Sequence, residues 1–176
     1  MKSTLKIKRL GDYIRQVDVR NKELRVKLLL GVSNEKYFIP SIANIEGTDL
    51  TSYKIVKFNQ FAYGTVTSRN GDKLSIALLK EHECIVSSSY IVFEIYDTEK
   101  LDPDYLMMWF KRPEFDRYAR YMSHGSVREL FGWEKICETK IPIPDIEEQR
   151  KIVHDYNVIE ERISIKEAIN NNLLLL

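Results

Sequence analysis

Hydrophobic and polar residues alternate along several short stretches in the first two thirds of the chain, a pattern typical of β-strands. Each stretch is rich in β-branched and aromatic residues and is bounded by turn-forming residues. Gly71-Asp72, preceded by Arg69-Asn70, should form a tight turn, because Asn and Gly tolerate the positive φ that such a turn requires. The predicted strands are Val26–Val32, Tyr53–Val56, Phe61–Val66, Leu74–Leu79, Ser89–Ile95 and Ile136–Ile143.

The pattern becomes helical after residue 101. Asp102 is a candidate N-cap, and Pro103 suits the first helical position, where its missing N–H does no harm. Pro113 interrupts this helix. Apolar residues then recur at i, i+3 and i+4 within Glu114–Tyr121, which predicts a second short helix.

A long helix is predicted at the C-terminal end. The prolines of Ile141–Pro144 favour extended backbone, and Asp145 is then well placed as an N-cap, with Glu148 three residues later as in a capping box. The helix either pairs with a partner helix or packs back on its own domain, and the spacing leaves both arrangements open. The residues of the coiled-coil seam, four, three and four positions apart, are Ile152, Tyr156, Ile159 and Ile163.

The order of these elements predicts a mixed α/β fold of the α+β-like kind. A twisted, mostly antiparallel sheet with short helices would occupy residues 1–144, and the long helix residues 145–176. The two cysteines, Cys84 and Cys137, lack CxxC spacing and nearby histidines, so we expect reduced, buried thiols. No stretch is long and apolar enough to cross a bilayer, and the charged start is unlike a secretory signal, so we expect a cytoplasmic protein without membrane contact.

The formal net charge of +1 conceals a strong segregation of charge along the chain. Residues 2–27 hold nine Lys/Arg against three acidic residues, and residues 54–80 hold five against one. Residues 111–128 hold five against two, whereas residues 81–104 hold seven acidic residues and one lysine. Three basic blocks could fold into one face suited to a polyanion. Ordinary solvated surface charge explains the same pattern equally well.

Motifs for enzyme chemistry are scarce. The sequence contains no GxxxxGK[ST], GxGxxG, HExxH or GxSxG pattern. Glu138 and Lys140 would share one face of the last predicted strand, as in metal-dependent nucleases that combine an Asp with Glu-x-Lys. Asp102 or Asp104 would have to complete that site. Because so short a pattern arises often by chance, a nuclease is a minor alternative.

Three stretches carry hydrogen-bonding groups of the kind that read base edges. In Phe61–Lys73, aromatic and small residues lead into a loop of donors and acceptors, in which Arg69 could bind guanine and Asn70 adenine. Ser87–Tyr90 and Ser123–Arg128 combine small polar residues in the same way. The alternative is that these residues merely form turns and strand ends.

Several blocks of sequence, in this order and spacing, resemble type I restriction-modification specificity subunits over about residues 5–170. The most specific part of the resemblance is a Gly-Ser-x-Arg segment followed by Ile-Pro-x-Pro and a helix start that contains Gln. The blocks are Lys8–Ile14, Leu30–Ser33, Tyr53–Val56, Gln60–Tyr63, Ser68–Gly71, Tyr105–Phe110, Glu114–Tyr118, Gly125–Arg128, Ile141–Pro144 and Glu148-Gln149.

This resemblance implies a subunit that selects a site on double-stranded DNA, while separate methyltransferase (modification) and motor-nuclease (restriction) subunits act on it. The chain would then be non-catalytic and would hold no cofactor or metal. Residues 1–144 would be a target-recognition domain that reads one half of a bipartite site, and residues 145–176 a spacer or dimerisation helix. Typical members carry two of each, so the chain is either a fragment or a half subunit that forms a homodimer through its helix.

Two groups of candidate contacts follow. Arg69 and Asn70 are candidate base readers, and Lys73 and Arg128 are candidate phosphate contacts. The alternative class of function is a protein-interaction scaffold that docks through its helix. The full candidate DNA-contacting set is Tyr63, Ser68, Arg69, Asn70, Lys73, Tyr90, His124, Ser126 and Arg128.

Overall fold

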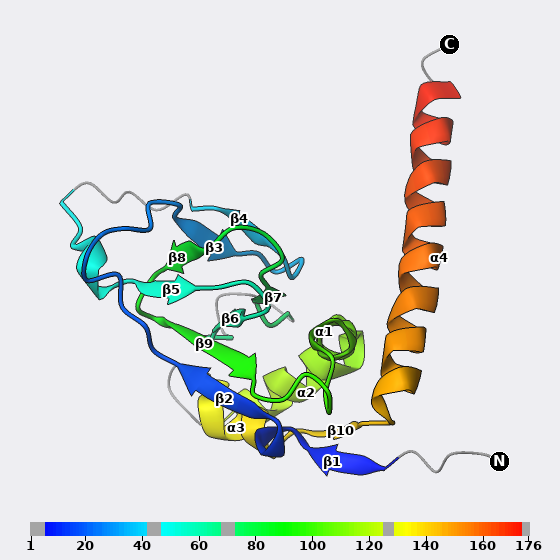
Figure 1. Cartoon of the computed structure of the whole chain (residues 1–176), viewed down its shortest axis with the longest axis horizontal. Helices are drawn as coiled ribbons and strands as arrows, with labels where there is room; N and C mark the ends of the chain where they lie inside the picture. The colour runs from blue at the N-terminus through cyan, green and yellow to red at the C-terminus, as the bar shows by residue number, and fades with distance from the viewer. Residues whose placement is uncertain (1–5, 42–46, 68–72, 125–128, 174–176) are drawn as a thin grey trace.

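The computed structural model describes residues 6–41, 47–67, 73–124 and 129–173 (Figure 1). Its centre is a four-stranded antiparallel sheet in the order β2-β9-β6-β7. In this sheet Phe61 is in register with Phe93 on one side and Leu78 on the other. The four strands are β2 (Ile14–Val17), β6 (Phe61–Gly64), β7 (Ile76–Leu78) and β9 (Tyr90–Ile95).

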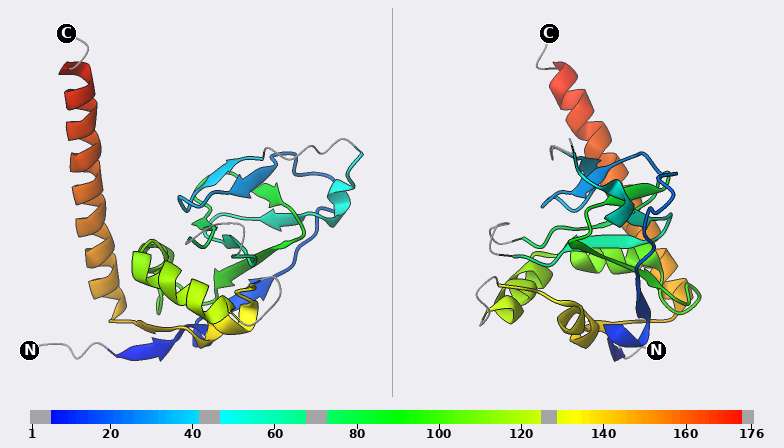
Figure 2. Two further views of the ribbon diagram at one scale, coloured as in Figure 1. Left: turned by 180° about the vertical axis from the view of Figure 1, so that it is seen from behind. Right: turned by 90° about the vertical axis from the view of Figure 1, so that its left-hand side faces the viewer.

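Three two-stranded antiparallel sheets accompany the central sheet in the described part of the chain. The pairs β3–β4 and β5–β8 lie on the side of the central sheet away from the short helices (Figure 2). The pair β1–β10 joins the two ends of the globular part. The predicted class, mixed α/β with a mostly antiparallel sheet, is therefore confirmed. These strands are β1 (Ile7–Arg9), β3 (Leu30–Val32), β4 (Phe38–Pro40), β5 (Lys54–Val56), β8 (Cys84–Val86) and β10 (Lys140–Pro142).

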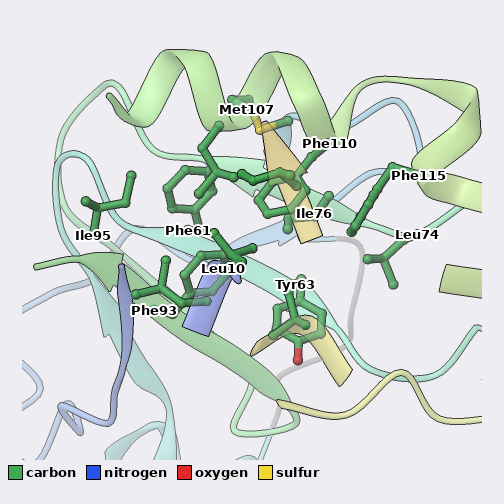
Figure 3. Packing of buried hydrophobic residues seen from close by; sticks show 14 of the residues in the cluster. Leu10, Phe61, Tyr63, Leu74, Ile76, Phe93, Ile95, Met107, Phe110 and Phe115 are labelled. Atoms are coloured by element: carbon green, nitrogen blue, oxygen red, sulfur yellow. The ribbon is translucent and has the colours of Figure 1, made fainter. Parts of the chain in front are cut away.

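Both faces of the central sheet are buried along β6. Ala62 and Val92 face the strands β3, β5 and β8, in a cluster of small and aliphatic side chains. On the opposite face the ring of Phe61 stacks on Phe93 with centroids 4.7 Å apart, and Phe110 from the first helix meets Phe61 edge-on at 5.9 Å (Figure 3). Burial of these large rings makes this second face the main hydrophobic core.

The two short helices after residue 101 are confirmed. The Asp102 side chain accepts hydrogen bonds from the backbone N–H groups of Asp104 at 2.8 Å and Tyr105 at 3.0 Å, so it is the predicted N-cap. A third helix was not predicted. The helical elements before the C-terminal helix are α1 (Pro103–Phe110), α2 (Pro113–Ser123), α3 (Trp133–Glu138) and the 3-10 turns η1 (Leu10–Asp12) and η2 (Leu50–Ser52).

The predicted strand at Ile136–Ile143 is wrong over its first half, because Ile136 lies in α3 and points into the core. Only β10 remains of it. The predicted strand at Val26–Val32 shrinks to β3, because Val26 belongs to a loop that the Asn21 side chain holds by hydrogen bonds of 2.9 and 3.2 Å. The other four predicted strands are present with shorter bounds. The predicted turn at residues 69–72 lies outside the described residues.

The helix α4 (Ile146–Leu173) begins as predicted, since the backbone N–H of Glu148 donates to the Asp145 carboxylate at 2.9 Å. Its first turns dock on the globular part. The fully buried Gln149 side chain accepts from the backbone N–H of Asp102 and donates to the carbonyl of Lys100. The rest of α4 rises away from the sheets (Figures 1 and 2). None of the described helices is long and apolar enough to cross a membrane.

Both cysteines are free thiols. Cys84 is buried as predicted, and burial raises its pKa to about 12. Cys137 is only half-buried, at the margin of the main core and next to Gly11. These thiols therefore lie apart, in β8 and α3, and belong to separate packing environments.

Candidate nucleic-acid interface

A cleft of about 840 Å³ is lined by the β3–β4 turn on one side and by α2 on the other. Positive side chains dominate its exposed lining, and an aromatic side chain accompanies them. We call this surface the basic cleft. The residues that carry its exposed or half-exposed cationic and aromatic groups are Lys73, Lys111, Arg117, Arg120, Tyr121 and His124.

One face of α2 supplies most of these groups. Arg117, Arg120, Tyr121 and His124 follow one another at i, i+3, i+4 and i+7, the spacing of a single helix face, with His124 as the C-cap. The ring of Tyr121 is 74% exposed. The opposite face of α2 is buried in the core. The helix therefore packs through its apolar side and presents guanidinium and aromatic groups to the cleft.

The backbone beside α2 brings two distant parts of the chain together. Val66 forms an antiparallel bridge with Leu130, and the Thr67 N–H donates to the Glu129 carbonyl at 3.0 Å. Thr67 directly precedes residues 68–72, and Glu129 directly follows residues 125–128. The flanks of the two polar loops singled out from the sequence are therefore neighbours.

Side chains of α2 bind these flanks. Arg120 lies 2.9 Å from the Glu129 carboxylate and donates to the Thr67 carbonyl at 3.3 Å. His124 Nδ1 is 3.5 Å from the same carboxylate. Glu129 has a positive φ of 47°, a conformation uncommon for a residue with a side chain and most frequent where surrounding contacts impose it. The loop flanks and the cationic helix face thus form one connected surface.

Acidic side chains neutralise part of the positive charge. Lys36 Nζ lies 2.6 Å from Asp116 Oδ1, and both side chains are almost completely buried. Burial lowers the pKa of Lys36, because the charged ammonium is disfavoured away from water. Lys73 pairs with Glu35 at 2.6 Å, and this hydrogen bond raises the pKa of Lys73.

The predicted DNA contacts fall into four groups, one of which is the buried Tyr63 alone. Lys73 and His124 line the basic cleft. Tyr90 is half-buried and lies apart from that lining, where its hydroxyl accepts from the backbone N–H of Val32 at 3.4 Å. The others lie outside the described residues, and their contacts stay predictions: Ser68, Arg69, Asn70, Ser126 and Arg128.

Tyr63 requires a correction. Its side chain is completely buried in the core face of β6, and its ring packs edge-on against Phe93 with centroids 6.0 Å apart (Figure 3). Burial also raises the pKa of its hydroxyl. Tyr63 is therefore a core residue, because β6 is covered on both faces and the side chain is not accessible to DNA.

The sequence interpretation missed most of the cationic face of α2. Arg117 and Arg120 were included only in the basic block of residues 111–128 and Tyr121 in no candidate set, although the helix around them was predicted. The signal was present in their spacing, which puts them on the face opposite the apolar positions. Lys111 was missed because it is the C-cap of α1, and the spacing within one helix does not relate it to residues of the next.

The nuclease alternative rested on an arrangement that the structure does not contain. Glu138 ends α3, where it lies 3.6 Å from Lys135, whereas Lys140 belongs to β10, so the two do not alternate along one strand. Asp104 pairs with Lys80 at 2.6 Å, and Asp102 caps α1. Among the described residues no group of three or more His, Cys, Asp or Glu side chains could hold a metal ion.

The predicted seam of α4 divides into two halves. Ile152 is half-buried against the core, and Tyr156 is half-buried with Lys111 Nζ 5.9 Å from its ring centroid. Ile159 and Ile163 are 56% and 45% exposed. The first half of the seam therefore packs on its own domain, and the second half is uncovered.

Comparison with known proteins gives a consistent result. The sequence matches the family described as type I restriction modification DNA specificity domain over residues 4–175. The fold is similar to a chain from a structure on the complex assembly and conformational transition of the type I R-M system, with TM-score 0.57 and 15% identity over 91% of this chain. It is also similar to the HsdS subunit from Thermoanaerobacter tengcongensis, with TM-score 0.56 and 14% identity over 94% of this chain.

In both comparisons this chain spans 39% of the other chain's length. A comparison with curated proteins gave no match. The family match covers almost the whole chain. The chain therefore belongs to the family of type I restriction modification DNA specificity domains.

Proposed function

We propose that this domain binds double-stranded DNA in the basic cleft and reads one half of a bipartite target sequence. The observation that carries the proposal is the cationic face of α2 beside the joined flanks of the two polar loops. Arginine and lysine side chains bind phosphates and fix the register of a protein on the duplex. The groups that discriminate bases would then come from the two polar segments, residues 68–72 after Thr67 and residues 125–128 before Glu129.

The ion pairs in the cleft fit this role. Arg117 is 70% exposed, and its nearest carboxylate, Glu114, lies 3.5 Å away on the helix surface. Such an exposed pair contributes little to stability, so a phosphate can replace the carboxylate at small cost. Tyr121 adds an exposed ring that can stack on a base or fill a groove. The cleft thus combines phosphate contacts with apolar contact area.

We infer that the chain is the non-catalytic, site-selecting component, and that methyltransferase and motor-nuclease subunits are its partners. The test is to sequence methylated adenines in cells that carry the chain with its methyltransferase partner. We expect one split motif that disappears when the chain is deleted. Methylation that keeps the same motif without the chain would contradict the proposal. The cytoplasmic location stays a prediction that follows from this role.

The exposed part of α4 supports the idea that a second recognition unit joins the first. A 28-residue helix is about 42 Å long, enough to hold two DNA-reading domains on separate parts of a duplex. A second copy of this chain would present an identical reader by two-fold symmetry, so the target would be a palindrome with a spacer. The symmetry of the methylation motif tests this point, because an asymmetric motif requires a different second reader.

A scaffold without DNA binding is the second candidate function. It is favoured by the exposed isoleucines of α4, which are suited to a partner helix. A pull-down with the methyltransferase subunit, combined with a salt-dependent titration of DNA, separates the candidates. Partner binding without any contribution to the choice of site would support the scaffold, and salt-dependent, sequence-selective DNA binding would support the reader.

A further inference from the structure

A buried ion pair joins the two walls of the basic cleft. Lys36 Nζ donates to Asp116 Oδ1 at 2.6 Å and to the Leu74 carbonyl at 3.0 Å. The same Asp116 oxygen accepts from the Leu74 N–H at 2.9 Å. The β3–β4 turn, the residues that enter β7 and the first half of α2 therefore meet at one carboxylate.

The backbone of the turn is adapted to this contact. Lys36 has a positive φ of 67°, and its N–H donates to the Ser33 carbonyl at 3.1 Å. Glycine or asparagine adopts this conformation more easily than lysine. A long cationic side chain at this position is therefore costly locally, and such strain persists where the surrounding structure imposes it, frequently at functional sites.

The chemistry of the pair points to a geometric role. Lys36 is buried and neutralised by Asp116, so it offers no charge to a phosphate, in contrast to the exposed Lys73 beside it. A buried ion pair is often no more stabilising than apolar side chains of similar volume. What the pair does provide is a fixed distance between two walls, because short charge-assisted hydrogen bonds tolerate little displacement.

We propose that Lys36 and Asp116 are positioning residues for DNA recognition, which set the separation of the β3–β4 turn from α2 and thereby the width of the basic cleft. The inference rests on the proposed function of this cleft. Loss of the pair leaves the phosphate-binding cations of α2 in place but lets the walls shift. Discrimination between DNA sequences then falls, while the number of phosphate contacts stays constant.

The test uses the full chain with the double substitution Lys36→Met and Asp116→Asn, which removes both charges and leaves no unpaired buried ion. The control is Lys80→Met with Asp104→Asn, a more exposed ion pair of the same 2.6 Å length that joins the segment after β7 to α1 outside the cleft. The wild-type chain first selects its preferred duplex from a random pool. The affinity for that duplex and for a scrambled one is then measured over a series of salt concentrations. The temperature is kept below the thermal denaturation midpoint of every variant.

We expect the Lys36/Asp116 variant to lose about tenfold in discrimination between preferred and scrambled duplexes, the size of one mismatched base pair, with an unchanged salt dependence. The control should keep both properties. Retained discrimination would overturn the inference. An equal loss of affinity for both duplexes, with the slope of log K against log salt smaller in magnitude by about one, would also overturn it, because that result marks a phosphate contact.

Failure of the proposed function has a different outcome, since the wild-type chain would then select no preferred duplex. If the double variant does not fold, Lys36→Gln with Asp116→Asn takes its place, since it also leaves no unpaired buried ion. The asparagine oxygen can still accept from the Leu74 N–H, so this variant replaces the charged contact between positions 36 and 116 by a neutral one and keeps the contact to Leu74, just before β7. The same expected and contradicting results apply to it.

Discussion

At the residue scale, Arg117 is the most direct test of the basic cleft. Its guanidinium is 70% exposed on the side of α2 that lines the basic cleft, so Arg117→Gln should remove one proposed phosphate contact without disturbing the core. Affinity should fall alike for all sequences, and the slope of log K against log salt should decrease in magnitude by about one. Arg25→Gln is the control, because Arg25 is 50% exposed in an ion pair with Glu83 outside the cleft. An unchanged slope in Arg117→Gln would contradict the assignment.

Gly11 is a second residue whose role can be measured. A Cβ atom there would lie 2.9 Å from Cys137 Cβ and 3.0 Å from the Cys137 carbonyl oxygen, which is closer than packed atoms allow. Gly11→Ala should therefore lower the free energy of unfolding by about 1–3 kcal/mol in a denaturant titration. The matched change is Gly132→Ser, at the N-cap of α3, where no described atom lies within 4 Å of the added Cβ and serine is a favoured cap. Equal stability of both variants would refute the packing argument.

Tyr63 shows where inference from single residues fails. In a sheet with one solvent-exposed face, every second side chain along a strand points to solvent. In β6 both faces are covered, so consecutive residues Phe61, Ala62 and Tyr63 are all buried. The sequence around them is hydrophobic or aromatic at each position, which fits a strand buried on both sides. Whether a strand is covered on one face or on both depends on contacts between residues far apart in sequence. The alternation of hydrophobic and polar residues could therefore not predict it.

At the element scale, α1 and α4 could be predicted from their capping residues, and α2, which has no side-chain cap, from the spacing of its apolar residues, whereas α3 was missed. Asp102 and Asp145 begin α1 and α4 as expected, because their side chains satisfy free N–H groups. The N-cap of α3 is Gly132, which offers no side-chain hydrogen bond, and the helix is only six residues long. Local signals there are weak, so the β-branched residues nearby favoured a strand.

Gln149 fixes the direction of α4 and provides an element-scale prediction. It is completely buried, and besides its bonds to Asp102 and Lys100 it donates to the Pro144 carbonyl at 2.8 Å. Gln149→Leu leaves these backbone groups without partners and should cost about 1–3 kcal/mol of unfolding free energy. Hydrogen exchange in the first turns of α4 should accelerate.

The control for this prediction is Arg150→Gln. Arg150 is half-exposed and pairs with the exposed Glu99 at 2.8 Å, so its loss should change stability by less than about 0.5 kcal/mol. If Gln149→Leu and Arg150→Gln had the same small effect, the docking of α4 would not depend on the buried amide.

At the scale of the whole molecule, the uncovered half of the α4 seam predicts self-association. Ile163→Glu should weaken a helix-paired dimer at least about tenfold, because a buried isoleucine contributes about 1.5–3 kcal/mol. Ile165→Glu is matched in exposure, at 52% against 45%, but lies about 200° around the helix from Ile163. Sedimentation equilibrium measures both. Equal effects of the two changes would contradict pairing through the predicted seam, as would a wild-type chain that stays monomeric at high concentration.

The pairing of β1 with β10 has a consequence for how such domains change. Ile7 lies opposite Pro142 and Arg9 opposite Lys140, so the chain enters and leaves the globular part side by side, at the base of α4 (Figure 1). Everything between these two strands is one segment of polypeptide that carries the whole of the basic cleft, the surface we propose to read DNA. Exchange of that segment for another of the same fold, with backbone groups in place of those of Lys100 and Asp102 to hold Gln149, would leave the direction of the helix unaltered. If the cleft reads DNA as proposed, such an exchange would change the preferred DNA sequence and keep the helix in place.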